Sequence, residues 1–225
     1  MSIDSSESPA HLGLGPELAF DVLEVRAAEH TATPTLLFDV EIRAPGHRVR
    51  SILLDVQIQI AARQRPYGEA AQERLLELFG TPERWGTTLR TLPWLRTTAV
   101  VPPFEEATVL ELPVPCTYDL EVTAARYFAA LEDGEIPLEL LFSGSVFFAA
   151  PNGGLQTVRI AWDSDVEHRL PVALWREAME RHFPDSAWLR LRRDSYDRLC
   201  AYKARHAHES WEAAIDSLLA DRQAP

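Results

Sequence analysis

The stretch TLLFDVEIRAPGHRVRSILLDVQIQI, residues 35–60, decides the fold. Apolar and polar residues alternate from position 36 to 42, and they alternate again from 52 to 60. Alternation with period two is typical of a strand that has one buried and one solvated face, and therefore of an antiparallel sheet. The Pro-Gly pair within residues 44–47 predicts a hairpin turn between two separate strands.

The rest of the chain adds strands with the same period and helices with a period near 3.6. Further strands are expected at residues 18–25, 95–101, 108–114, 136–148 and 155–163, with helices at 68–79, 119–131 and 172–183 and one long helix from Asp194 or Ser195 to 221. Residues 119–123 also alternate like a strand, so that part stays open between helix and strand. PNGG at 151–154 predicts a hairpin turn.

These elements predict the α+β class, with an antiparallel β-sandwich, inserted helices and a C-terminal helical pair packed on the sheet. The polar residues 1–16 are expected to form a disordered tail. Residues 17–165 are expected to form the sandwich, and residues 166–225 the docked helical segment. The whole is predicted to be one cooperative domain.

Composition excludes several classes of function. A formal net charge of −12 disfavours a nucleic-acid surface and an anionic membrane surface, because both would repel the chain. Two cysteines make no disulfide framework, and the first residues lack the basic and apolar regions of a signal peptide. The absence of an apolar run of about 18 residues argues against a membrane span. We therefore expect a cytoplasmic protein.

The motifs that carry chemistry are missing from the sequence. Cys116 lies between Pro115 and Thr117, and a free cysteine there is expected to be a small buried filler. A position close to a helix amino terminus would favour the thiolate, so a reactive Cys116 remains the alternative. The seven histidines are scattered without metal-ligand spacing, and no phosphate-binding glycine motif occurs. We expect no catalytic residue, no metal and no cofactor.

Two segments are candidates for binding a protein. RWGTTLRTLPWLR presents Trp85, Arg90, Trp94 and Arg96 in an expected loop, and tryptophan and arginine are enriched among the residues that dominate interfaces. The alternative is that both tryptophans turn inward and cover the end of the sandwich.

The second candidate segment is WLRLRRD, which brings the basic residues Arg190, Arg192 and Arg193 into an otherwise acidic chain. These arginines could bind an acidic partner surface. The alternative is pairing within the chain, between this segment and the acidic face of the sheet.

Three strings, RWGTTLRTLPW, LPVPCTYDLEVTAARYFAALEDGEIPLELLFSGSVF and LPVALWREAMERHFPDSAWLRLRRDSYDRL, resemble a family of bacterial proteins, chiefly from actinomycetes, that is known as a domain of unknown function. The resemblance runs from about residue 17 to 220. It implies genes near high-affinity uptake nickel-iron hydrogenases, and hence a hydrogenase or its maturation machinery as partner. The leading hypothesis is a non-catalytic accessory or assembly protein that acts by protein–protein binding. The alternative is a small-molecule-binding or hydrolytic enzyme with a cleft between sandwich and helices.

Overall fold

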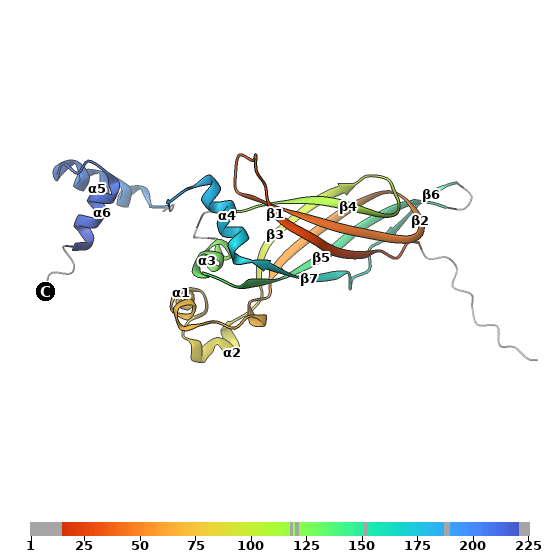
Figure 1. Cartoon of the computed structure of the whole chain (residues 1–225), viewed down its shortest axis with the longest axis horizontal. Coiled ribbons are helices and arrows are strands. Elements are labelled where there is room, and N and C mark those ends of the chain that lie inside the picture. Colours follow the sequence, from red (N-terminus) through yellow and green to blue (C-terminus); the bar gives the residue numbers. More distant parts are fainter. Residues whose placement is uncertain (1–14, 118, 120–121, 151–152, 187–189, 221–225) are drawn as a thin grey trace, which may run out of the picture. The chain divides into compact units, whose positions relative to one another are not determined.

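The structure is a computed structural model that describes residues 15–117, 119, 122–150, 153–186 and 190–220 (Figure 1). Nearly all of the tail expected at 1–16, and part of the PNGG turn, therefore lie outside the described residues. The chain divides into two compact units, Met1–Ala187 and Trp188–Pro225. That the chain unfolds as one cooperative domain stays a prediction.

The first unit contains a seven-stranded sheet in which every pairing is antiparallel, so the predicted α+β class is confirmed. Its strands are β1 (Ala19–Ala27), β2 (Thr35–Ile60), β3 (Leu92–Val101), β4 (Phe104–Pro115), β5 (Glu135–Ala149), β6 (Leu155–Arg159) and β7 (Asp165–Pro171). The hairpin predicted around PNGG is present as the pair β5 and β6. Strand β7 crosses the boundary predicted at residue 165, so the sheet runs to Pro171.

The hairpin predicted at residues 44–47 is wrong, because β2 runs straight through them as one strand of 26 residues. Pairing with β4 continues from Ala44 opposite Glu106 to Arg48 opposite Glu105, so residues 45–47 form a bulge. Gly46 has a φ of +72°, a conformation that suits a bulge as well as a turn. After the bulge, the second half of β2 pairs with β3.

The two halves of β2 belong to two sheet layers that face each other. The first half pairs with β1 and β4, and the second half pairs with β3 and β5. Phe20 on β1 stacks on Phe142 on β5, with ring centroids 4.2 Å apart, although these strands do not pair. Contact between unpaired strands of the two halves is the geometry of a sandwich.

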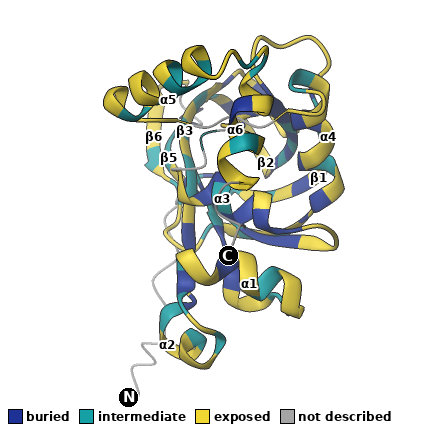
Figure 2. Cartoon of the chain, turned by 90° about the vertical axis from the view of Figure 1, so that its left-hand side faces the viewer, coloured by how far each residue is buried: buried dark blue, intermediate teal, exposed yellow. Residues whose placement is uncertain are grey.

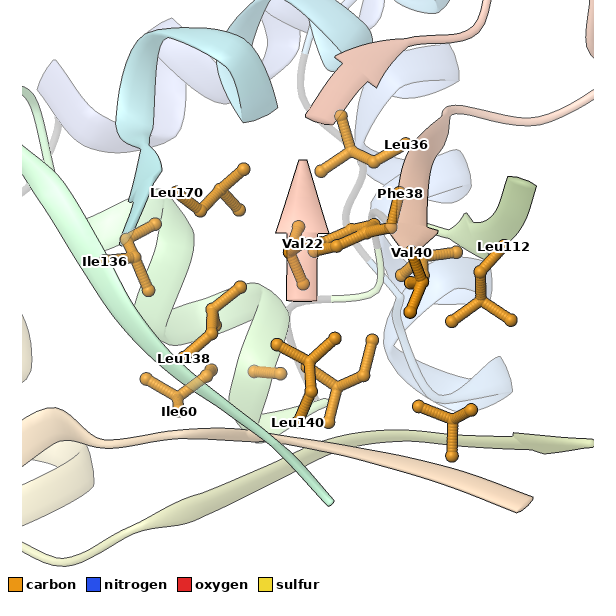
Figure 3. Packing of buried hydrophobic residues seen from close by; sticks show 14 of the residues in the cluster. Val22, Leu36, Phe38, Val40, Ile60, Leu112, Ile136, Leu138, Leu140 and Leu170 are labelled. Atoms are coloured by element: carbon orange, nitrogen blue, oxygen red, sulfur yellow. The ribbon is translucent and has the colours of Figure 1, made fainter. Parts of the chain in front are cut away.

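The alternating residues of β2 form the centre of the core. The apolar side chains at even positions from Leu36 to Ile42 and from Ile52 to Ile60 are all 0% exposed. Burying one such side chain stabilises a fold by about 1.5–3 kcal/mol. Figure 3 shows Phe38, Val22 and Leu138 from three strands within one cluster. The period-two pattern therefore predicts this core face correctly.

The helices of the first unit gather at one end of the strands (Figure 1). They are α1 (Glu69–Phe79), α2 (Trp85–Thr88), α3 (Thr123–Ala130) and α4 (Val172–His182), with short 3₁₀ turns at Ala62–Gln64 and Pro82–Arg84. The ambiguous segment at 119–131 is helical from Thr123, after an extended Val122. Helix α4 begins directly after Pro171 and packs on β1, β2 and β7.

The second unit contains α5 (Arg193–Arg205) and α6 (Trp211–Ala220), so the single long helix predicted from residue 194 to 221 is wrong. Ala207 has a φ of +53°, which interrupts the helix. The Lys203 Nζ donates to the carbonyl oxygens of His208 and Glu209, at 2.8 and 3.2 Å. Ser210 then caps α6 by accepting a hydrogen bond from the Ala213 amide at 3.0 Å.

Candidate protein-binding surface

Trp85 lies on α2 and turns inward. Its indole Nε1 donates to the carbonyl oxygen of Gly80 at 2.8 Å. Its ring meets Tyr67 and Phe79 edge-on, with centroids 5.2 and 6.0 Å away. Such pairs add about 0.5–1.5 kcal/mol beyond the area they bury. The side chain is half-buried, so its contacts are those of a cover over the end of the core.

Trp94 lies on β3, because the strand begins at Leu92 and the expected loop is shorter than predicted. Its ring meets Phe128 of α3 at 4.8 Å and Phe38 of β2 at 6.2 Å. Trp94 therefore joins the α3 helix to the sandwich. Both tryptophans follow the inward alternative that the sequence left open.

Beneath Trp85, two tyrosines form a hydrogen-bonded pair. The Tyr67 hydroxyl donates to the Ala62 carbonyl at 2.6 Å and lies 2.7 Å from the Tyr127 hydroxyl. Burial raises the pKa of both phenols above the usual value of about 10. The Arg65 guanidinium near the Tyr67 ring lowers that pKa only in part. Both hydroxyls are therefore protonated at neutral pH, as a structural pair requires.

The arginines of the same segment point to solvent. Arg90 is exposed just before β3, and Arg96 is exposed on the strand. The Arg96 Nη2 lies 4.0 Å from Asp55 Oδ2, and the two side chains are 71% and 38% exposed. An ion pair this long and this exposed contributes little stability. Both guanidinium groups are therefore accessible to a partner.

Strand β3 is an edge of the sheet, because its one strand partner within the described part of the chain is β2. An edge strand leaves alternate backbone N–H and C=O groups unpaired, and such a row can accept a strand from another chain. Pro93 in β3 and the Pro102-Pro103 pair after it were the sequence signals for an edge, since proline within a sheet is largely confined to edges.

The β3 edge is also basic in an acidic chain. From Arg84 to residue 104 the sequence contains three arginines and no aspartate or glutamate. The edge strand β4, in contrast, carries Glu105, Glu106 and Glu111. We call Arg90, Arg96 and strand β3 together the β3 edge. It combines unpaired backbone groups with two exposed positive charges.

The second basic candidate segment belongs to the second unit. Arg192 is exposed and directly precedes α5, and Arg190 is also exposed. The Arg193 Nε lies 3.3 Å from Asp197 Oδ1, one helical turn away. Arg190 and Arg192 therefore precede α5, and Arg193, the first residue of α5, is partly neutralised within its own helix.

Cys116 is buried, as the sequence predicts. It is 5% exposed, and its Sγ lies 3.7 Å from the Val114 carbonyl oxygen. Burial raises the pKa of the thiol to about 12, so the thiolate is negligible at neutral pH. A reactive role for this residue is thus disfavoured by its surroundings. Among the described residues, no group of three or more metal-ligating side chains is found.

One cavity lies between the end of β1 and helix α4, where the sequence placed an enzyme cleft as the alternative. It has a volume of about 460 Å³, and its lining includes His30, Leu174, Glu177 and Arg181. The Arg181 Nη2 donates to Glu177 Oε1 at 2.5 Å, so these two charges neutralise each other.

The described helices include none that is both long and apolar enough to cross a membrane.

The fold and its surface define an α+β protein with a seven-stranded antiparallel sheet that has a basic edge at β3. The chain belongs to DUF6084, a family of unknown function, which matches residues 15–225. No curated protein matches the chain.

Three solved structures overlap the fold loosely. A candidate late embryogenesis abundant protein is 16% identical, with 69% of this chain and 71% of that chain covered and a TM-score of 0.32. A candidate ApaA protein from Bordetella pertussis is 13% identical, with 70% and 96% covered and a TM-score of 0.26. A β-glucosidase from Kluyveromyces marxianus is 8% identical, with 69% and 15% covered and a TM-score of 0.23. At these values the overlaps carry no argument about function.

Proposed function

We propose that this protein is a non-catalytic cytoplasmic accessory protein that binds another protein through the β3 edge. The observation that carries the proposal is the accessible edge strand Leu92–Val101, which has exposed Arg90 just before it and exposed Arg96 on it, in a chain of net charge −12. An extended segment of the partner would pair with the backbone of β3, and acidic side chains of that segment would meet Arg90 and Arg96.

The physics of strand addition assigns separate roles to backbone and side chains. Hydrogen bonds along β3 would supply sequence-independent affinity, whereas the arginines would select an acidic segment and speed its association. The outward side chains Thr98 and Val100 alternate with Arg96 on the same face and would contact alternate side chains of the added strand. Binding should therefore weaken as the salt concentration rises, because at an ionic strength of 0.1 M the attraction between exposed charges falls off over a screening length of about 10 Å.

The partner follows from the family resemblance rather than from the fold. Members of the family resemble proteins encoded near uptake nickel-iron hydrogenases, so a hydrogenase subunit or a hydrogenase maturation protein is the first partner to test. The basic segment of Arg190, Arg192 and Arg193 would then serve as a second contact for an acidic surface.

The test is affinity capture of the tagged full chain from its host, followed by mass spectrometry. The matched pair is Arg90→Glu/Arg96→Glu on the β3 edge and Arg50→Glu/Arg159→Glu elsewhere, where both arginines are also exposed. These variants make the same change in net charge. We expect the first variant to lose the partner and the second to retain it. Equal recovery with all three proteins, or no partner with the wild type, would count against the proposal.

The cavity beside α4 supports a second candidate, the small-molecule-binding or hydrolytic enzyme. Its volume falls within the range of about 300–1,000 Å³ that is usual for ligand sites. Thermal unfolding of the wild type and of Leu174→Trp, which would fill the cavity, in the presence of a metabolite library would test this candidate. A compound that stabilises only the wild type would favour it over the accessory role.

A further inference from the structure

The α5–α6 pair has almost no interior of its own. Ala214 is its one buried residue among those described, and α5 buries none (Figure 2). The two helices meet through the hydroxyls of Tyr202 and Ser217, which are 2.8 Å apart, and through the rings of Tyr196 and Trp211, with centroids 5.8 Å apart. Isolated helices of 13 and 10 residues are marginal in water. The pair therefore needs a further surface to cover it.

The uncovered surface is an apolar row along α6. Trp211, Ile215, Leu218 and Leu219 follow the spacing i, i+4, i+7 and i+8, which places them on one helical face. Their exposed fractions run from 37% to 58%. Tyr196 of α5, which is 44% exposed, extends the row through its contact with Trp211. Large apolar side chains left this open in a row mark an interaction surface.

The charges beside this row are divided between the two helices. Helix α5 contains four basic and two acidic residues, whereas α6 contains Glu212 and Asp216 and no basic residue. The pair is therefore positive on one helix and negative on the other, so its surface is complementary to itself. The second unit holds seven of the 22 basic and six of the 34 acidic residues, which leaves the first unit with a net charge of −13. That acidic unit is a poor partner for α6.

We propose that a second copy of the chain covers this face. Two α5–α6 pairs would associate about a two-fold axis, with α5 of each copy against α6 of the other, to form a four-helix bundle. Leu191, just before α5, is a further apolar side chain that is 39% exposed. At roughly 200 Å² for each large side chain, the apolar row together with Tyr196 and Leu191 exposes roughly 500 Å² per copy. Two copies would bury roughly 1,000 Å², which reaches the lower bound for a specific interface. The inference is independent of the β3 edge.

The first test is the mass of the full chain in solution, measured by size-exclusion chromatography with light scattering over a range of concentrations. We expect a dimer for the wild type. Ile215→Arg would place a charge in the interface and should raise the dissociation constant at least ~100-fold. Leu155→Arg, at a 68% exposed position on β6, is the control and should leave the dimer intact. A monomeric wild type, or a dimer that survives Ile215→Arg, would overturn the inference.

The second test uses charge inversion and does not depend on the apolar row. Arg198→Glu/Arg205→Glu makes α5 acidic, and Glu212→Arg/Asp216→Arg makes α6 basic. Each variant alone should be shifted toward monomer, because like charges face each other in both halves of the symmetric contact. An equimolar mixture should regain the dimer, because each helix then meets its opposite charge. Docking of the α5–α6 pair on its own first unit predicts no rescue on mixing, and that result would refute the proposed arrangement.

Discussion

Replacing Tyr67 by phenylalanine should destabilise the fold far more than the same change at Tyr127. The Tyr67 hydroxyl has one proton, which it donates to the Ala62 carbonyl at 2.6 Å. The 2.7 Å contact with Tyr127 therefore has the Tyr127 hydroxyl as donor and the Tyr67 oxygen as acceptor. One hydroxyl thus satisfies two groups of residues that are both 0% exposed.

The magnitudes follow from what each variant leaves unpaired. Tyr67→Phe strands the Tyr127 donor and the Ala62 acceptor, at about 1–3 kcal/mol each, so the loss should be about 2–6 kcal/mol. Tyr127→Phe removes one hydrogen bond and strands no buried donor, so its cost should be about 0.5–1.5 kcal/mol. In the double variant residue 127 has no hydroxyl and needs no acceptor. The free energy of unfolding that the double variant loses should therefore be smaller than the sum of the losses of the two single variants.

The assay is urea unfolding of the full chain followed by far-UV circular dichroism. The midpoint should fall in the order wild type, Tyr127→Phe, Tyr67→Phe, with the slope against urea unchanged. A loss for Tyr127→Phe that equals or exceeds the loss for Tyr67→Phe would refute the direction of these hydrogen bonds. Strict additivity in the double variant would show that the hydroxyls do not interact.

Three further predictions concern Cys116, His168 and Gly144. Burial raises the pKa of the Cys116 thiol to about 12, so the contribution of the protonated thiol to the free energy of unfolding is complete below the unfolded pKa of about 8.5 and declines as pH rises from there toward 12. This decline should be shallower in Cys116→Ala, and in the native protein a thiol reagent should label Cys200 well before Cys116. Burial lowers the pKa of His168, so the contribution of its neutral imidazole to the free energy of unfolding is complete above a pH of about 6.5 and declines as pH falls below that value. His168→Asn should therefore reduce the fall in the free energy of unfolding at acid pH, measured by urea unfolding at a series of pH values. Gly144 has a φ of +142°, and an added Cβ would lie 2.0 Å from the Leu53 carbonyl oxygen. Gly144→Ala should therefore lower the free energy of unfolding, measured with urea, by at least ~3 kcal/mol. A decrease of less than 1 kcal/mol would contradict this geometry.

Sequence patterns predict correctly those features of the helices and strands that depend only on neighbouring residues. The alternation in β2 predicts which residues face the core, because the side-chain period of a strand is fixed by its backbone. The Pro-Gly pair at 45–46 does not say whether the chain turns or bulges, since both need the same backbone conformation at Gly46. Only pairing with the distant strands β3 and β4 decides between the two.

The same distinction explains the C-terminal helices and the candidate surface. The apolar spacing continues across residues 206–210, so a periodic pattern alone joins α5 to α6. Ser210, a typical cap before an apolar run, was the readable sign of a second helix start. For Trp85 and Trp94, composition indicates a binding role or a covering role equally, and only their contacts with Tyr67 and Phe128 distinguish the two.

Hydrogen exchange of the full chain, with and without its captured partner, tests the accessory role most directly. If the partner adds a strand to the β3 edge, amides within Leu92–Val101 that exchange rapidly in the free protein should become protected on binding. Amides of the opposite edge strand, Leu155–Arg159, should exchange at unchanged rates. Protection confined to other elements, with Leu92–Val101 unaffected, would contradict the proposed binding edge.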